Sequence, residues 1–93
     1  MFNLPRTYSM ANNQTVIETE DCNAFQSYDS LVAKYDRKTH ELTLGKDWDY
    51  SKTTVRWLHV FFERYVQKYD GCSTATIRKF IEAGMIKYDP DMK

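Results

Sequence analysis

The chain has 93 residues, and its 13 Lys and Arg balance its 13 Asp and Glu, so the formal net charge is zero. A chain of this length buries one modest core and leaves no room for a large catalytic scaffold. Hydrophobic residues make up 42% of it, with 3 Gly and 2 Pro, which excludes a disordered or collagen-like chain. We therefore expect one α+β domain over residues 1–93.

The zero net charge hides an asymmetry between the two halves of the chain. Residues 1–50 carry 8 acidic and 5 basic side chains, whereas residues 51–93 carry 5 acidic and 8 basic ones. The two halves can complement each other or present opposite faces to partners. The basic excess is too mild to predict a nucleic-acid partner by itself.

The first residues hold neither an apolar run of roughly 7–15 residues nor a small-residue cleavage pattern, so no secretory signal is predicted. No stretch reaches the roughly 18 apolar residues that span a bilayer. Cys22 and Cys72 lie far apart without CxxC spacing. This pattern favours two free thiols in a reducing compartment over a disulfide. We expect the protein in the cytoplasm of its host cell.

The first half of the chain predicts a small antiparallel sheet over residues 13–45. Residues 1–12, interrupted by Pro5, are interpreted as an N-terminal arm or a short strand. Residues 15–19 are rich in β-branched side chains, which favours a strand. Residues 30–35 lead through the turn residues 36–40 into residues 41–44, where apolar and polar side chains alternate, which predicts a hairpin. The sheet should hold about three strands.

The second half predicts one long and one short helix within residues 51–83. Apolar side chains recur at helical spacing from Ser51 to Tyr69, with Asp49 or Ser51 as the N-cap. Ser73 can cap a shorter helix over residues 74–83, and Gly84 is placed to end it. Residues 85–88 can form a last short strand, and residues 89–93 should be a frayed tail.

The histidines and cysteines fit no catalytic or metal-binding pattern. His40 lies in the predicted turn and His59 on the long helix, and neither belongs to a recognisable motif. Two Cys and two His without paired spacing do not make a zinc site. The sequence therefore predicts that the protein is not an enzyme and holds no metal and no cofactor.

Residues 48–54 are the most distinctive stretch, because two aromatics and three hydroxyls surround a helix start. Backbone N–H groups there, together with Lys52, can bind an anion. The alternative is that the hydroxyls cap the helix while Trp48 and Tyr50 staple it to the sheet. Trp57, beside Arg56, fits an interface anchor and a core residue equally well.

Acidic and aromatic side chains make the predicted partner-binding surface, because tyrosine gives contact area at low entropic cost and acids suit a basic groove. These residues are Glu18, Glu20, Asp21, Tyr28, Asp29, Tyr50 and Trp57. An alternative surface, suited to nucleic acid, uses basic residues of the second half. Its members are Lys52, Arg56, Arg64, Lys68, Arg78 and Lys79.

Four segments resemble a group of small phage and prophage proteins. Residues 27–33 (SYDSLVA) match an SY-x-S-x-VA strand, residues 48–54 (WDYSKTT) contain a YS-x-TT helix start, Trp57-Leu58 follows, and residues 77–86 (IRKFIEAGMI) are similar to the end of those proteins. The resemblance covers roughly residues 7–88. Trp57 stands where His is common in TT-x-x-H.

The resemblance implies a mobile-element origin and a small protein that binds a host machine stoichiometrically. Anti-CRISPR and other anti-defence inhibitors are a prominent class of such proteins, and this is an inference by analogy. We therefore expect an inhibitor of a host defence protein or CRISPR effector complex. The alternatives are a small nucleic-acid-binding regulator and a homodimeric accessory protein that buries Trp57.

Overall fold

The computed structural model describes residues 6–92 and confirms the α+β class. Its elements follow the order β1 (Arg6–Ala11), β2 (Gln14–Glu18), β3 (Cys22–Ser27), β4 (Ser30–Asp36), β5 (Leu42–Leu44), α1 (Lys52–Tyr65), the 3-10 helix η1 (Gln67–Tyr69), α2 (Thr74–Glu82) and β6 (Lys87–Tyr88). The strands form one mixed sheet in the order β1-β2-β3-β4-β5-β6. The prediction of about three strands is therefore wrong, because this sheet has six.

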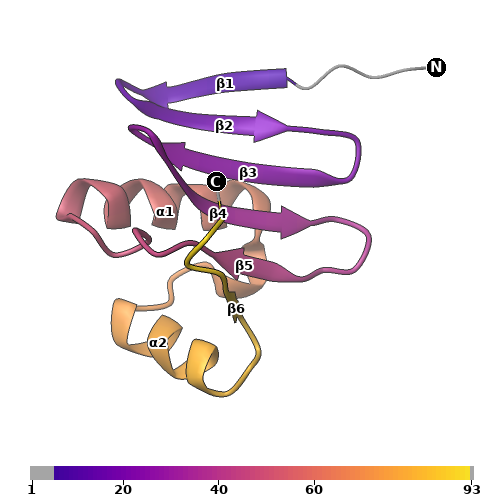
Figure 1. Cartoon of the computed structure of the whole chain (residues 1–93), viewed down its shortest axis with the longest axis vertical. Helices are drawn as coiled ribbons and strands as arrows, with labels where there is room; N and C mark the ends of the chain where they lie inside the picture. Colours follow the sequence, from indigo (N-terminus) through magenta and orange to yellow (C-terminus); the bar gives the residue numbers. More distant parts are fainter. Residues whose placement is uncertain (1–5, 93) are drawn as a thin grey trace.

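Antiparallel hairpins build the sheet from β1 to β5, and β6 adds to β5 in parallel (Figure 1). The register places Val16, Phe25, Ala33 and Leu44 in one row across β2 to β5, and all four are fully buried. Side chains that share a row in paired strands point to the same face. This row is the sheet's contribution to the core.

Helix α1 begins as predicted and ends earlier than predicted. The side chain of Ser51 accepts a hydrogen bond from the Thr54 N–H at 3.1 Å, so Ser51 and not Asp49 is the N-cap. Val66 leaves the helical region at φ −134° and ψ 65°, and η1 follows. A continuous helix over residues 51–69 is therefore wrong, because the backbone turns after Tyr65.

The C-terminal part wraps back onto β5. Ser73 caps α2 as predicted, and Gly84 adopts the left-handed φ of 79° that ends it. The Asp89 N–H then donates to the Leu44 carbonyl at 2.9 Å, and the Met92 N–H donates to the Asp89 carbonyl at 3.2 Å. Asp89 is thus bonded to the sheet, and residues 89–92 form a hydrogen-bonded turn whose first three residues are exposed. Residue 93 of the predicted frayed tail lies outside the described residues.

The N-terminal segment follows the strand alternative and not the arm. Residues 6–11 form β1, which pairs with β2 from Arg6 opposite Glu18 to Ala11 opposite Gln14. Residues 1–5 of the predicted arm lie outside the described residues.

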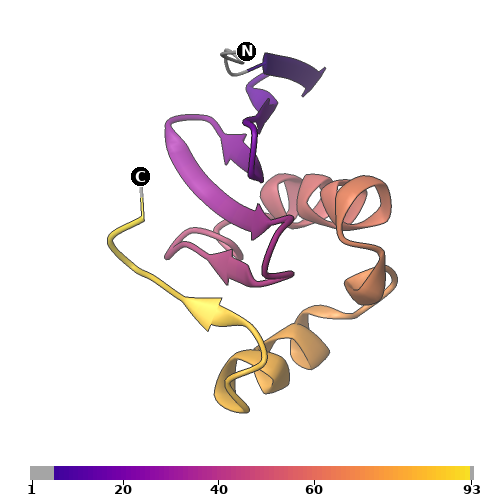
Figure 2. The same ribbon diagram turned by 90° about the vertical axis from the view of Figure 1, so that its right-hand side faces the viewer.

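One helix covers one face of the sheet. Helix α1 packs against β2, β3 and β4, and α2 lies below it beside β5 and β6, while the C-terminal segment lies on the opposite side of the sheet (Figures 1 and 2). Leu58, Phe61 and Phe62 of α1 are fully buried, and the Phe61 ring stacks on Phe25 at 5.9 Å between centroids. No helix within residues 6–92 is long and apolar enough to cross a membrane.

Two ion pairs connect the acidic first half of the chain to the basic second half. Arg78 Nη2 lies 2.8 Å from Asp49 Oδ2, and Lys87 Nζ lies 2.6 Å from Glu41 Oε2. Both pairs are exposed, so each adds little to stability, roughly 0–1 kcal/mol. They nevertheless show that part of the charge asymmetry is satisfied within the molecule.

Both cysteines are free thiols.

Candidate functional site: a hollow between two tyrosines

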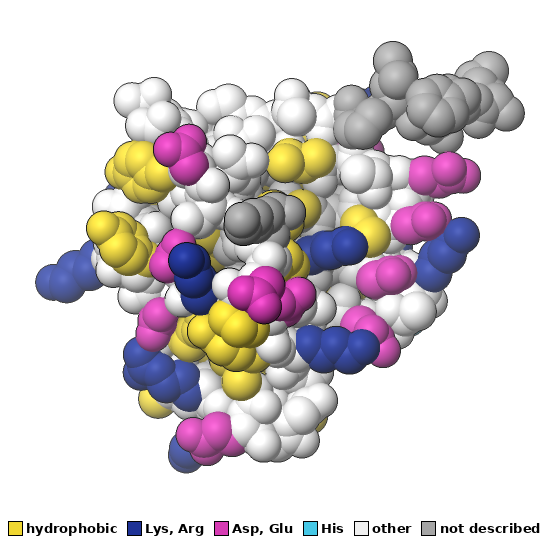
Figure 3. Space-filling model, viewed as in Figure 1, with side chains coloured by type: hydrophobic (Ala, Val, Ile, Leu, Met, Phe, Trp, Pro, Cys, Tyr) yellow, Lys and Arg dark blue, Asp and Glu magenta, His cyan; other side chains and the backbone are white. Residues whose placement is uncertain are grey.

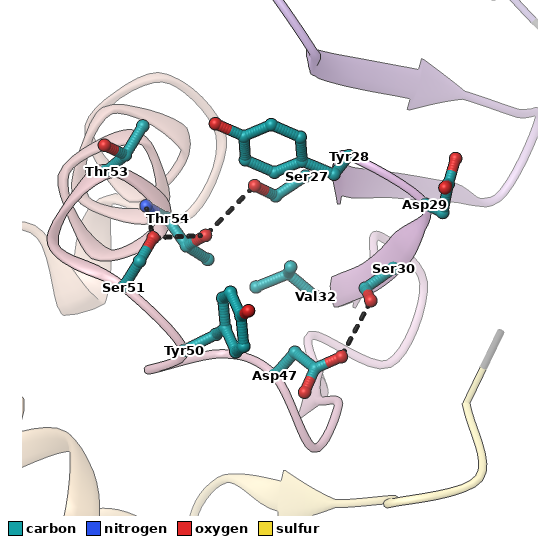
Figure 4. Close-up of a pocket in the computed structure, with 10 residues that line it drawn as sticks. All are labelled: Ser27, Tyr28, Asp29, Ser30, Val32, Asp47, Tyr50, Ser51, Thr53 and Thr54. Carbon is teal, nitrogen blue, oxygen red and sulfur yellow. Dashed lines mark hydrogen bonds between the residues drawn. The ribbon is translucent and has the colours of Figure 1, made fainter.

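A hollow of about 620 Å³ lies between the β3–β4 turn and the start of α1 (Figure 4). We call it the tyrosine hollow. It is lined by Ser27, Tyr28, Asp29, Ser30, Val32, Asp47, Tyr50, Ser51, Thr53 and Thr54. It therefore joins two segments that stood out in the sequence, residues 27–33 and 48–54, which are far apart along the chain.

Two tyrosines stand on opposite sides of this hollow, as Figure 4 shows. Tyr28 comes from the β3–β4 turn and is 52% exposed, and Tyr50 comes from the loop before α1 and is 77% exposed. Tyr28 has a left-handed φ of 54°, which is uncommon outside glycine, asparagine and aspartate. Its backbone N–H donates to the Asn13 carbonyl at 2.7 Å, which holds the turn in this conformation.

A chain of hydroxyl groups forms the inner wall. Ser51 Oγ donates to Thr54 Oγ1 at 3.2 Å, and Thr54 Oγ1 lies 3.1 Å from the hydroxyl of buried Ser27. Either hydroxyl can donate in the bond between Thr54 and Ser27, because a hydroxyl oxygen can accept two hydrogen bonds. These bonds tie β3 to the first turn of α1 and fix the position of Tyr28 relative to Tyr50.

The outer wall carries the charge of the tyrosine hollow. Ser30 Oγ donates to Asp47 Oδ2 at 2.7 Å, which orients this half-buried carboxylate. Asp29 is exposed at the rim. Among residues 6–92 the lining has two carboxylates and no Lys, Arg, His or Cys. It can therefore accept hydrogen bonds and a positive charge, but it brings no histidine or thiol beside its hydroxyls to act as base or nucleophile.

The predicted acidic cluster is not brought together. Asp29 lies at one end of β3, whereas Glu18, Glu20 and Asp21 lie at or beyond the other end, about 20 Å away for a six-residue strand. Asp21 forms an exposed ion pair with Lys38 at 3.0 Å, which raises the pKa of the lysine. The sequence grouped these acids because they are near in the chain, but the strand separates them.

The turn that holds Glu20 and Asp21 is organised by one side chain. The guanidinium of Arg37 donates to the carbonyl oxygens of Thr19, Glu20 and Cys22 and to Asn23 Oδ1. A half-buried guanidinium with four acceptors fixes the backbone of this turn. We therefore assign Arg37 a role in the fold.

Trp57 is half-buried on α1 and packs against the core cluster, with the Arg56 guanidinium 5.6 Å from the centre of its ring. Neither sequence alternative holds in full, because the ring is shared between core and surface. The staple prediction holds for Trp48, which is buried, but is wrong for Tyr50, which is mostly exposed.

The basic residues divide into two groups. Lys52, Arg56 and Arg78 line a second hollow of about 600 Å³, which shares Tyr50 and Ser51 with the tyrosine hollow. Arg64, Lys68 and Lys79 do not line it, and Lys68 instead donates to the His40 carbonyl at 2.7 Å. Figure 3 shows Lys and Arg side chains interspersed with Asp and Glu on the face it presents. On that face the basic side chains do not form one continuous patch.

One protein-family model matches most of the chain. A family of unknown function, DUF8033, matches residues 3–79. The chain belongs to this family. No curated protein and no solved structure matches it. The DUF8033 segment contains every residue of the tyrosine hollow, whereas β6 lies beyond it.

Sequence reasoning found Tyr28, Asp29 and Tyr50 but missed Ser27, Ser30 and Asp47 of the same site. Ser27 and Ser30 lie inside the SYDSLVA segment, so the motif was a usable signal for them. Asp47 offered none, because only its hydrogen bond to Ser30 across the fold distinguishes it from other loop aspartates. Within residues 6–92 no group of three or more metal-ligating side chains gathers.

Proposed function

We propose that this DUF8033 protein is a non-enzymatic protein that acts by binding another protein through the tyrosine hollow. The observation that carries the proposal is that Tyr28 and Tyr50, 52% and 77% exposed, flank a hollow. In the part of the chain that the structure describes, the charged residues that line it are Asp29 and Asp47. Exposed tyrosines beside a pocket are frequent anchors of protein interfaces. The carboxylates suit a partner segment that carries Lys or Arg.

The target we propose is a host defence protein in the cytoplasm. Among such targets we propose a CRISPR effector complex. The resemblance to phage and prophage proteins supports this choice. Charge supports it as well, since nucleic-acid grooves are basic and an acidic, tyrosine-rich surface complements them. Binding of this kind needs no cofactor and blocks the groove stoichiometrically.

Phage plaquing on an immune host tests the proposal. Expression of the protein should restore plaquing, and the purified chain should co-purify with the defence complex. Tyr50→Ala and Asp29→Asn should reduce both effects at least tenfold, because each removes an exposed contact group without touching the core. Tyr88→Ala and Asp89→Asn are matched controls, since both residues are exposed outside the hollow.

Unchanged plaquing, with no defence complex retained, would show that defence inhibition is the wrong function. Equal losses in Tyr50→Ala and Tyr88→Ala would show that the tyrosine hollow is the wrong surface.

A second candidate, a nucleic-acid-binding regulator, is favoured by the hollow that Lys52, Arg56 and Arg78 line. Arg78 is already paired with Asp49 at 2.8 Å, which lowers the charge available to phosphate groups. Binding to random duplex DNA should weaken steeply with salt if this candidate holds. Absence of a mobility shift at low salt removes it.

A further inference from the structure

Strand β1 is an open edge of the sheet. It pairs with β2, and no other strand of residues 6–92 lies along its second side (Figure 1). In an antiparallel strand every second residue directs its N–H and C=O away from the paired neighbour. Over residues 6–9, before the register shift between Ser9 and Ala11, the strand therefore leaves about two donors and two acceptors facing outward. The Ala11 carbonyl accepts from Ser9 Oγ at 3.0 Å.

The two edges of the sheet are not equivalent. The opposite edge strand, β6, has two residues, and very short edge strands deter pairing with other chains. Strand β1 has six residues with no Pro and no Lys, and a register shift between Ser9 and Ala11 limits its regular edge to residues 6–9. Its one charged residue, Arg6, stands at its first position.

The helix-facing side of β1 is also uncovered. Tyr8 pairs with Val16, so both side chains point to the face that α1 covers. Val16 is fully buried, yet Tyr8 is 43% exposed. Figure 2 shows the reason, because β1 extends past the layer formed by α1. The edge of the sheet is therefore not covered by α1, and the Tyr8 ring lies on this uncovered surface.

We infer that β1 pairs antiparallel with β1 of a second copy of this chain, about a two-fold axis perpendicular to the sheet. The two sheets then continue into one, and both α1 helices lie on the same side of it. Tyr8 and its symmetry mate fill the uncovered space between the two α1 helices. The antiparallel arrangement places the two Arg6 side chains at opposite ends of the interface.

A second copy suits this edge because a two-fold interface must be self-complementary. An antiparallel strand edge offers equal numbers of outward donors and acceptors, and Tyr8 lies near its middle. A six-residue strand gives an interface at the small end of the known range, so the dimer should be weak and concentration-dependent. The contact does not involve Trp57 and is independent of the tyrosine hollow.

Sedimentation velocity of the full chain tests this inference. Between about 5 μM and 1 mM the mass should rise from 11.1 kDa toward twice that value. Tyr8→Lys should weaken dimerisation at least tenfold, because it puts two ammonium groups beside the axis. Tyr88→Lys is the matched control, since Tyr88 lies on the other edge strand and is 47% exposed. It should dimerise like the parent chain.

Amide hydrogen exchange supplies an independent readout. Raising the protein concentration should slow exchange at alternate residues of β1 and leave β6 unchanged. A chain that stays monomeric at 1 mM overturns the inference. A dimer that Tyr8→Lys leaves intact overturns it too, because the contact then lies elsewhere.

Discussion

Replacing Gln14 by Met should stabilise the protein. Gln14 is fully buried at the start of β2, and neither Oε1 nor Nε2 of its carboxamide has a hydrogen-bond partner among residues 6–92. A buried polar group without a partner loses its hydration and gains nothing in return. Methionine has nearly the same length and carries no polar group that needs a partner.

The expected gain follows from these observations. Leaving a buried donor or acceptor unpaired costs about 1–3 kcal/mol, and a change in side-chain shape gives back up to about 1.5 kcal/mol. We therefore expect Gln14→Met to raise the free energy of unfolding by about 1 kcal/mol, the middle of the range that these two terms give. In a domain of this size that corresponds to a rise in Tm of roughly 4–8 °C.

Thermal and urea unfolding followed by circular dichroism measure this effect. Gln26→Met is the matched control, because Gln26 lies on the neighbouring strand and its Nε2 donates to the Tyr28 carbonyl at 3.0 Å. The control should lose about 0.5–1.5 kcal/mol. A loss of 1 kcal/mol or more in Gln14→Met would refute the reasoning. It would show that the carboxamide is hydrogen-bonded, for example to a buried water.

Three further changes test other parts of the fold. Gly45→Ala should cost about 1–3 kcal/mol in urea unfolding, because its Cβ would lie 2.4 Å from the Leu31 carbonyl oxygen; a neutral result would mean that the β4–β5 backbone shifts freely. Two backbone N–H groups of the β4–β5 turn lower the pKa of Asp36, so its contribution to stability is present above about pH 4 and lost on acidification. Asp36→Asn should remove that part of the acid dependence, and an unchanged profile would contradict it. Burial raises the pKa of the Tyr69 hydroxyl, so the stability that its neutral form contributes is lost as the pH rises above about 10. Tyr69→Phe should therefore unfold at a higher pH than the parent chain in alkaline titrations. Equal alkaline midpoints would contradict this last reasoning.

The helical half was predictable because its signals are local. Ser51 and Ser73 cap helices by bonding N–H groups three residues on, and that spacing is visible in the sequence. The end of α1 was not visible in the sequence, because the apolar spacing continues through Tyr69. Tyr69 is buried, but it belongs to η1 and not to α1. Periodicity reports which side chains are buried but not where the backbone turns.

The sheet was underpredicted for the opposite reason. Strand β3 reads Cys-Asn-Ala-Phe-Gln-Ser, with no β-branched residue and no simple alternation, and it is a strand because β2 and β4 pair with it on both sides. The tyrosine hollow depended on the same long-range pairing. Sequence identified Tyr28 and Tyr50, but only the fold places them across one cavity.

The agreement between strand order and chain order bears on how the protein is made. Strands β2 to β5 each pair with the strand synthesised just before them, so the closing loops are short and the hairpins can form as the chain emerges. This nascent sheet has its apolar row exposed until α1 has been translated. Strand β6 must wait longest, because it reaches β5 only after both helices have formed. We therefore expect the period before α1 leaves the ribosome to be the most aggregation-prone stage of synthesis.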